Sequence, residues 1–257
     1  MCSSDLPTDR SFRLKEISEL ANIAVKNKAD ILVFPEAYIP LSALHLLDKI
    51  CKKSQMMIIC GIEHFISSNQ IWNLTCTLVP VNIFGFKYSI PFWKQKRFFT
   101  PEEKRIIKSC KIKNCKIAKA NTKNNLFNWK GFNFSTYCCY DLSSINNRSA
   151  FIGEADVIFA VEWNKDVNYF SNIIESLSRD MYCYCVQSNM SKYGDSRIVQ
   201  PKHSYYKDIL KVKGGENSTI LIGEIDIQSL RCARKNSIFR KENEFAELPA
   251  GIKFKNT

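Results

Sequence analysis

Cys139 has the residue type and the surroundings of a nucleophile. It lies in an apolar, aromatic run, FSTYCCYD over residues 134–141, and a polar turn with serines and asparagines follows. This pattern predicts a buried strand that ends just before a helix, a position where a thiol is held rigidly and can still meet a substrate. Cys138 is the alternative, because adjacent strand residues face opposite ways. Either thiol could instead be an apolar filler, since the chain has eleven cysteines.

Glu36 could act as a base for such a thiol. It follows a short apolar strand predicted over residues 30–34, and Pro35 separates the two. A carboxylate fixed there is partly desolvated, which we expect to raise its pKa and to make it a better base. The alternative is that Glu36 is an ordinary cap or loop residue.

Lys96 begins a third segment, KRFFTPEE over residues 96–103. A lysine in this setting could place a fixed positive charge beside a developing oxyanion. The alternative is one more solvated lysine in a basic run. A thiol needs a base or a cation close by to ionise near neutral pH, and Glu36 and Lys96 would supply one of each.

The order of these motifs resembles the nitrilase, or carbon–nitrogen hydrolase, superfamily. The matching pieces are VFPE at residues 33–36, K-x-x-F-x-P-x-E at residues 96–103 and CYD at residues 139–141. Further matches are ADVI at 155–158, SRD at 178–180, QSN at 187–189 and YGDSRI at 193–198. The segment from residue 178 to residue 198 is most similar to nitrilase-like domains joined to bacterial reverse transcriptases in phage defence.

The resemblance implies a four-layer α-β-β-α sandwich and a hydrolase that cleaves a carbon–nitrogen bond of an amide or nitrile. Cys139 matches the nucleophile, which forms a thioester with the acyl group, and Glu36 matches the general base. Lys96 and the backbone N–H of Tyr140 match the groups that stabilise the oxyanion. Glu103 matches a second acid that orients the site. Water, or in some members another amine, then removes the acyl group, and no metal or cofactor is implied.

Two departures from the family pattern concern the substrate pocket. Many members have an arginine soon after the cysteine motif, where this chain has Ser143 and its nearest arginine is Arg148. The usual small residue before a tryptophan is replaced by Glu162, in the sequence VEWN. Trp163 could line the pocket and bind substrate, or it could simply pack. We therefore expect a pocket that differs from the usual one.

Strands and helices alternate along the chain, which predicts an α/β protein with at least one mixed sheet. Helices are expected at residues 10–28, 44–53, 144–152 and 168–181. Strands are expected, among others, at residues 56–61, 70–80, 82–89, 132–138, 156–161 and 218–227. No long linker interrupts the sequence, so a single domain over residues 1–257 is expected. Because a helix comes almost first, the first strand of the fold is expected to be missing, as in a fragment or module of a longer protein.

Most of the net charge of +12 falls in one segment. Residues 94–123 contain eleven Lys or Arg and two Glu, a net charge of +9. One reading is a solvated lysine-rich loop and surface strand. The other is a contact site for nucleic acid or another anionic partner. That second reading supports an alternative function, a non-catalytic or regulatory nitrilase-like module in a reverse-transcriptase-linked defence system.

The remaining composition bears on compartment and partners. The N-terminus lacks the pattern of an export signal, and no run of about 18 apolar residues could span a membrane. The cysteines lack the spacing of a disulfide scaffold, so thiols in a reducing cytoplasm are expected. Cys110 and Cys115 have no second pair at metal-ligand spacing, so no zinc site is predicted. A homodimer is a further expectation, because relatives commonly dimerise through helices near the nucleophile.

Overall fold

The computed structural model describes residues 10–109, 115–121, 123–235 and 245–255. The chain divides into two compact units, an N-terminal unit over Met1–Thr122 and a C-terminal unit over Lys123–Thr257. Each unit is described by itself. Within the described ranges, no helix combines the length and the apolar character needed to cross a membrane.

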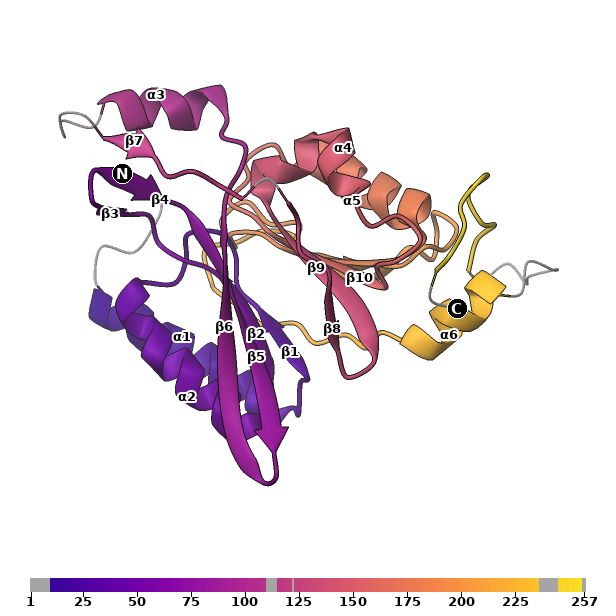
Figure 1. Ribbon diagram of the computed structural model, residues 1–257, viewed down its shortest axis with the longest axis horizontal. Coiled ribbons are helices and arrows are strands. Elements are labelled where there is room, and N and C mark those ends of the chain that lie inside the picture. Colours follow the sequence, from indigo (N-terminus) through magenta and orange to yellow (C-terminus); the bar gives the residue numbers. More distant parts are fainter. Residues whose placement is uncertain (1–9, 110–114, 122, 236–244, 256–257) are drawn as a thin grey trace. The chain divides into compact units, whose positions relative to one another are not determined.

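The N-terminal unit combines helices with two sheets (Figure 1). Its helical elements are α1 (Arg10–Lys26), η1 (Leu41–Ala43), α2 (Leu44–Ser54) and α3 (Pro101–Ser109). Its strands are β1 (Ile31–Val33), β2 (Met57–Gly61), β3 (Phe65–Ser67), β4 (Gln70–Trp72), β5 (Leu74–Ile83), β6 (Phe86–Gln95) and β7 (Lys116–Ile117). The four-stranded sheet has the order β1-β2-β5-β6, and the three-stranded sheet has the order β3-β4-β7.

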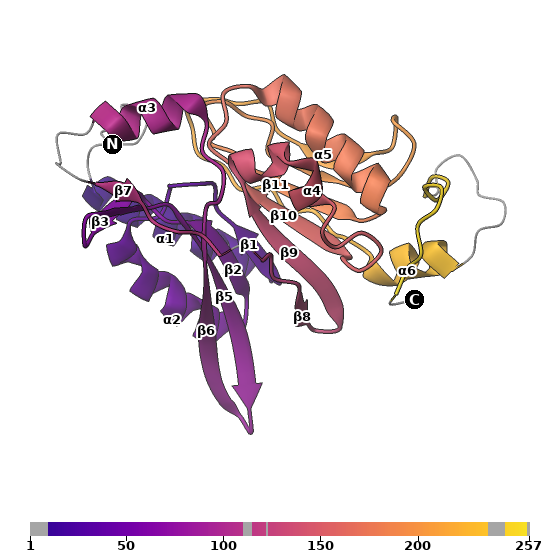
Figure 2. The same cartoon turned by 45° about the horizontal axis from the view of Figure 1, so that its top comes forward.

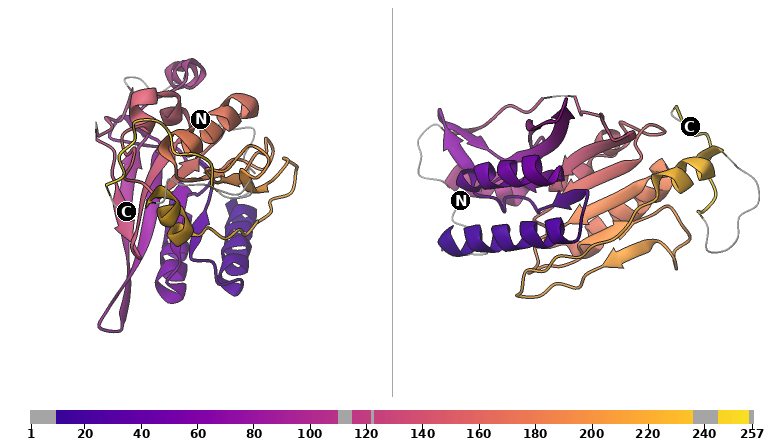
Figure 3. Two further views of the ribbon diagram at one scale, coloured as in Figure 1. Left: turned by 90° about the vertical axis from the view of Figure 1, so that its right-hand side faces the viewer. Right: turned by 90° about the horizontal axis from the view of Figure 1, so that it is seen from below.

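Helices α1 and α2 lie alongside each other, as Figure 3 shows. The buried residues Ile17, Ala21 and Ala24 recur at steps of three and four along α1, which is the spacing of one helix face. In α2 the thiol of Cys51 donates to the carbonyl of Leu78 on β5 at 3.5 Å. One face of α2 therefore packs on the four-stranded sheet, and the helix expected over residues 44–53 is confirmed.

Strands β5 and β6 form a long hairpin, and its turn lies at a different position from the strand boundary predicted from the sequence. The segment predicted as one strand over residues 70–80 begins with β4 and continues in β5, and the break expected near residue 81 is absent. The turn lies instead at Phe84 and Gly85, between the ten-residue strands β5 and β6. Both turn residues have positive φ, 52° and 86°, as a two-residue hairpin turn of the primed type requires. Phe84 is an unusual residue for such a turn, which is why the sequence pattern did not reveal it.

In its described part, the basic segment contains helix α3, which was not predicted, and the short strand β7. Helix α3 begins with a reciprocal cap, in which Thr100 N donates to Glu103 Oε2 at 2.7 Å and Glu103 N donates to Thr100 Oγ1 at 3.1 Å. The helix packs on the β4–β7 pair through a small apolar cluster, made of Ile71, Phe99 and Ile107 with Cys115 and Ile117 against it. Lys111 and Lys113 of this segment lie outside the described residues.

The C-terminal unit is built on one sheet of six strands (Figure 2). Its strands are β8 (Phe127–Trp129), β9 (Phe132–Cys138), β10 (Val157–Val161), β11 (Tyr184–Ser188), β12 (Arg197–Val199) and β13 (Asp208–Lys211). Its helical elements are η2 (Cys139–Ser143), α4 (Ile145–Arg148), α5 (Val167–Met181) and α6 (Ile227–Lys235). The central strands β9, β10 and β11 are parallel, and the flanking strands pair antiparallel. All residues of β9 and β10 are buried, including the polar Asn133, Ser135 and Thr136 of β9. The continuous apolar run of β10 and the aromatic residues of β9 had predicted buried strands.

Two predicted elements of the C-terminal unit are wrong. The helix expected over residues 144–152 is helical only in α4, and turns follow it. The strand expected over residues 218–227 is not a strand, although its residues alternate. Gly223 instead lies against the side chains of Ile198 and Leu210, so this segment covers the face of the β12–β13 pair rather than adding to its edge.

Helix α6 was not predicted. Two of its arginines hold it in place through ion pairs with a buried aspartate. Arg234 Nη1 lies 2.6 Å from Asp156 Oδ1, and Arg231 Nη2 lies 2.5 Å from Asp156 Oδ2. Asp156 also accepts from the backbone N–H of Asn133 at 2.9 Å. These partners satisfy a fully buried carboxylate, which would otherwise be costly.

The predicted mixed α/β class is confirmed, and each unit contributes a sheet with helices, as a layered sandwich requires. The expectation of a missing first strand concerns residues before Arg10, which lie outside the described residues. The single-domain expectation stays a prediction.

Candidate active site

Glu36 is held by close backbone contacts at the end of β1. The N–H of Phe34 donates to Ile59 O at 2.8 Å, and the N–H of Gly61 donates to Pro35 O at 3.1 Å. A Cβ added to Gly61 would lie only 2.4 Å from the Cα of Glu36. Glycine is therefore required at position 61, because any side chain at this position would push the Glu36 backbone away.

Lys96 connects the motifs of the N-terminal unit. Its Nζ lies 2.9 Å from Glu36 Oε1 and 2.6 Å from Glu103 Oε1. Its backbone N–H donates to Asn73 O at 2.9 Å, and the Asn73 side-chain amide donates to Glu36 Oε1 at 2.8 Å. Lys96, Glu36 and Asn73 are almost completely buried. The structure thus brings three predicted residues, Glu36, Lys96 and Glu103, into one buried ion cluster.

The pKa of Glu36 is lowered, which differs from the expectation that burial would raise it. Desolvation by burial does push the pKa upward. The charge of Lys96 and the hydrogen bonds from Lys96 and Asn73 favour the ionised form and outweigh that effect. Glu36 is therefore a carboxylate at neutral pH, the protonation state in which it can accept a proton.

Two polar neighbours of Glu36, Asn73 and His64, were not predicted from the sequence. Asn73 lies at the junction of two strands, and no motif drew attention to it. His64 belonged to no pattern, since the three histidines of the chain are scattered. Burial lowers the pKa of His64 to about 4, with Glu36 opposing the shift and Lys96 adding to it. The His64 Nε2 atom is buried and has no hydrogen-bond partner among the residues that the structure describes.

Cys139 is the first residue of η2, directly after β9 in the C-terminal unit. Its φ of 42° is unusual for a residue with a side chain, and such backbone strain concentrates at functional sites. The Asn147 amide donates to Asp141 O at 2.8 Å, and Tyr137 OH donates to Asn147 O at 2.9 Å. These bonds tie the turn after Cys139 back to the strand before it. Cys138, the alternative nucleophile, is the last residue of β9 and is buried.

Trp163 and Tyr140 leave the same edge of the sheet as Cys139. Strand β10 pairs with β9 so that Val161 lies beside Cys138. The two parallel strands therefore end side by side, and the chain leaves the sheet after each of them. Trp163 is half-buried two residues beyond Val161, and Tyr140 is half-buried in η2. This is the edge of a parallel sheet where ligands bind.

Glu162, the residue that departs from the family pattern, is fully buried beside Trp163. Its Oε2 accepts from the side-chain amide of Gln187 at 3.0 Å, and its N–H donates to Ser188 O at 2.8 Å. The glutamate is thereby fixed to the end of β11, and it holds the backbone that carries Trp163.

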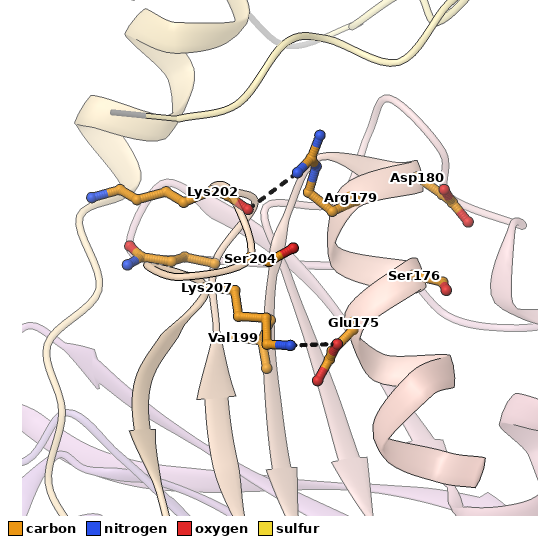
Figure 4. A pocket seen from close by; sticks show the side chains of 9 residues that line it. Glu175, Ser176, Arg179, Asp180, Val199, Lys202, Ser204 and Lys207 are labelled. Carbon is orange, nitrogen blue, oxygen red and sulfur yellow. Dashed lines mark hydrogen bonds and ion pairs between the residues drawn. The ribbon is translucent and has the colours of Figure 1, made fainter. Parts of the chain in front are cut away.

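A separate pocket of about 270 Å³ lies between α5 and the chain after β12 (Figure 4). Two of its basic side chains are engaged within the pocket: Lys207 Nζ lies 2.6 Å from Glu175 Oε2, and Arg179 Nη1 donates to the backbone carbonyl of Lys202 at 3.2 Å. None of the residues predicted for catalysis lines it. We therefore do not assign the reaction to this pocket.

Comparison with known proteins decides the family. The family model described as carbon–nitrogen hydrolase matches residues 3–235. The chain belongs to the carbon–nitrogen hydrolase family. A search of curated proteins gave no match to this carbon–nitrogen hydrolase.

Solved structures similar to this carbon–nitrogen hydrolase include an amidase from Nesterenkonia sp. One of them is 16% identical, covers 82% of this chain and 84% of its own, and has a TM-score of 0.62. A mutant of the amidase from Nesterenkonia sp. AN1 is 15% identical, covers 90% of this chain and 93% of its own, and has a TM-score of 0.65. At this sequence identity the likeness establishes the fold alone.

Proposed function

We propose that this carbon–nitrogen hydrolase is an amidase, with Cys139 as nucleophile and Glu36 as general base. The observation that carries the proposal is the buried contact between Lys96 and Glu36, at 2.9 Å, in a chain of this family. A buried lysine held by two carboxylates is a fixed cation, and structural packing alone does not call for one. An anion that develops during a reaction does call for one.

The proposed first half-reaction forms a thioester. The Glu36 carboxylate takes the proton of the Cys139 thiol, and the sulfur attacks the amide carbon as the C=O electron pair moves onto oxygen. Lys96 Nζ and the backbone N–H of Tyr140 stabilise this oxyanion. The C–N bond then breaks as the oxyanion re-forms the carbonyl, and Glu36 returns its proton to the leaving amine.

The second half-reaction releases the acid. Glu36, again a carboxylate, takes a proton from water, and the hydroxide attacks the thioester carbon. The C–S bond breaks, and the proton on Glu36 returns to the sulfur of Cys139. Each half-reaction begins with Glu36 in the ionised state that Lys96 and Asn73 favour. Glu103 would hold Lys96 in place through its contact of 2.6 Å.

The similar solved structures agree with an amide substrate. A Glu-to-Gln mutant of the Nesterenkonia sp. AN1 amidase shows Michael addition of acrylamide at its active site cysteine. A mutant of the same amidase was solved in complex with butyramide. Those observations belong to that protein, and they suggest small aliphatic amides as the first compounds to test.

Covalent capture tests the proposed function. The protein is incubated with a panel of small amides, and intact mass is measured after rapid acid quenching. We expect an acyl adduct on the wild type and on Cys138→Ala, and none on Cys139→Ala. Glu36→Gln should lower turnover by roughly 10²–10⁴-fold. An adduct that persists in Cys139→Ala would show that the nucleophile is misassigned.

A second function, binding of a polyanion, is favoured by one observation. Lys104, Arg105 and Lys108 are exposed on α3, while the acid Glu103 of the same helix is engaged by Lys96. The test is the salt dependence of binding to single-stranded DNA by Lys104→Gln/Arg105→Gln/Lys108→Gln. A control that neutralises the exposed Lys15, Lys26 and Lys28 removes the same charge from α1 and the turn that follows it. Equal affinity in both variants would argue against a site on α3, and the link to reverse transcriptases stays a prediction.

A further inference from the structure

The β5–β6 hairpin carries an exposed apolar row on one face. Alternate residues of β6 share a face, and Phe86, Tyr88 and Ile90 are exposed by 66%, 50% and 45%. Phe92 continues the row toward the sheet. The register places Ile83 of β5 opposite Phe86 on the same face, and Ile83 is also half exposed.

Helix α2 covers the opposite face of this hairpin. Ser89 bonds to Asp48 of α2, and Lys87 Nζ reaches the carbonyl of Lys53 at 3.5 Å. The residues of β6 that face α2 therefore include Lys87 and Ser89, and those that face away from it between Phe86 and Phe92 are apolar. This is the reverse of the usual pattern, in which a sheet covered on one face presents polar side chains on the other.

The outer half of the hairpin has little support from its own sheet. Strand β2 pairs with β5 only over residues 75–78, so β5 and β6 continue beyond it as a two-stranded ribbon (Figure 2). At the tip, Phe84 is 97% exposed. An isolated two-stranded ribbon is marginally stable, and covering its apolar face would stabilise it.

The size of this apolar face matches one half of a protein–protein interface. The exposed fractions of Phe84, Phe86 and Tyr88, with Ile83 and Ile90, amount to on the order of 600 Å² for each copy. Two such faces would bury roughly 1,200 Å², the lower end of the range for specific interfaces. Patches of this size on soluble proteins are commonly interaction sites.

The uncharged row gives a second copy of the chain a surface where charge repulsion is weakest. The protein has a net charge of +12, so most approaches of two copies bring like charges together. The row of Phe86, Tyr88 and Ile90 contains no charged residue. Two copies can therefore meet there with less repulsion than over α3, and the same patch on both satisfies a two-fold axis.

The backbone indicates how the copies would meet. Lys96 N bonds to Asn73 O, so even-numbered residues of β6 direct their N–H groups toward β5 and odd-numbered ones direct theirs to the open edge. Pro91 is odd-numbered and supplies no N–H at that edge. Pairing of two β6 edges would be interrupted in the middle, so face-to-face packing is favoured.

We propose that two copies of this chain associate through the exposed face of the β5–β6 hairpin, packed face to face about a two-fold axis. This interface is distinct from the helices near the nucleophile through which the resemblance suggested dimerisation. It also does not depend on the proposed chemistry, because no residue assigned to catalysis belongs to the face.

Sedimentation velocity from about 1 to 100 µM tests the proposal. We expect the wild type to be a dimer in the upper part of this range and Phe86→Glu/Ile90→Glu to remain a monomer throughout. Tyr205→Glu is the control, since Tyr205 is 90% exposed and belongs to the C-terminal unit rather than to the hairpin. It should dimerise like the wild type. A monomeric wild type, or a dimer that survives Phe86→Glu/Ile90→Glu, would overturn the proposal.

Cross-linking gives a second measurement that does not depend on a destabilising charge. In Tyr88→Cys the new thiol lies on the apolar face, and in Lys87→Cys it lies on the face toward α2. Mild oxidation should yield a covalent dimer several-fold faster for Tyr88→Cys than for Lys87→Cys or the wild type. Equal rates in all three proteins would contradict face-to-face packing.

Discussion

Lys96 Nζ lies 2.9 Å from Glu36 Oε1, although 60 residues separate the two in the chain. Both side chains are almost fully buried, so each charge depends on the other for compensation. The contact requires the end of β6 and the turn after β1 to meet, which is a property of the four-stranded sheet.

Lys96→Met should destabilise the protein by about 3–5 kcal/mol at pH 7, because it leaves the buried Glu36 carboxylate without its cation. Chemical denaturation measures the loss. The deficit should shrink as pH falls toward 4, since a protonated Glu36 no longer needs a cation. Lys52→Met is the control, because Lys52 forms a partly exposed i,i+4 ion pair with Asp48, and its loss should cost less than about 1 kcal/mol. A double mutant Glu36→Gln/Lys96→Met that is no more stable than Lys96→Met would contradict the reasoning.

Asn73→Ala should raise the pKa of Glu36, since the amide bond of 2.8 Å favours the carboxylate. A hydrogen bond to a charged group contributes about 1.5 kcal/mol, which corresponds to roughly one pH unit. The acid limb of kcat/KM for amide hydrolysis should therefore move upward by about one unit. Asn128→Ala, which removes a surface amide pair in the C-terminal unit, should leave the limb in place.

His64 should make the protein lose stability as pH falls from about 6.5 to about 4. Its pKa is lowered to about 4 in the folded protein, below the usual histidine value of 6.5. As pH falls, the unfolded chain therefore binds the proton before the folded protein does. The stabilisation is complete above pH 6.5, and its loss through this window could reach about 3 kcal/mol. His64→Gln should flatten the profile between pH 4 and 6.5. His203→Gln, at an exposed site, should follow the wild type, and an unchanged slope in His64→Gln would show that other groups cause it.

Gly61→Ala should destabilise the protein by about 3 kcal/mol and reduce amide hydrolysis. The added Cβ would lie 2.4 Å from the Cα of Glu36, and backbone atoms cannot rotate away as a side chain can. Thermal unfolding and turnover measure the two effects. Gly215→Ala is the matched control, because nothing lies within 4 Å of its Cβ position. Similar losses in both variants would remove the argument that Gly61 positions Glu36.

The sequence by itself determined the central strands and the residues at their ends. Strands β2 and β10 are short, continuous apolar runs, and β9 is rich in aromatic residues, patterns that can be recognised in the local sequence. Helix α5 was equally visible from its periodicity. Cys139 could be placed at a strand end because the change from buried run to polar turn occurs within eight residues.

Only the tertiary structure decided the electrostatics of Glu36 and the use of ambiguous segments. Burial alone predicted a raised pKa, and the lowered pKa comes from Lys96 and Asn73, which are 60 and 37 residues away. The residues over 218–227 alternate like a strand, yet they cover β12 and β13 because Gly223 fits against their side chains. Local pattern sets which residues are apolar, whereas the direction of a pKa shift and the partner of a segment depend on atoms brought near by folding. Those distances are absent from any window of sequence.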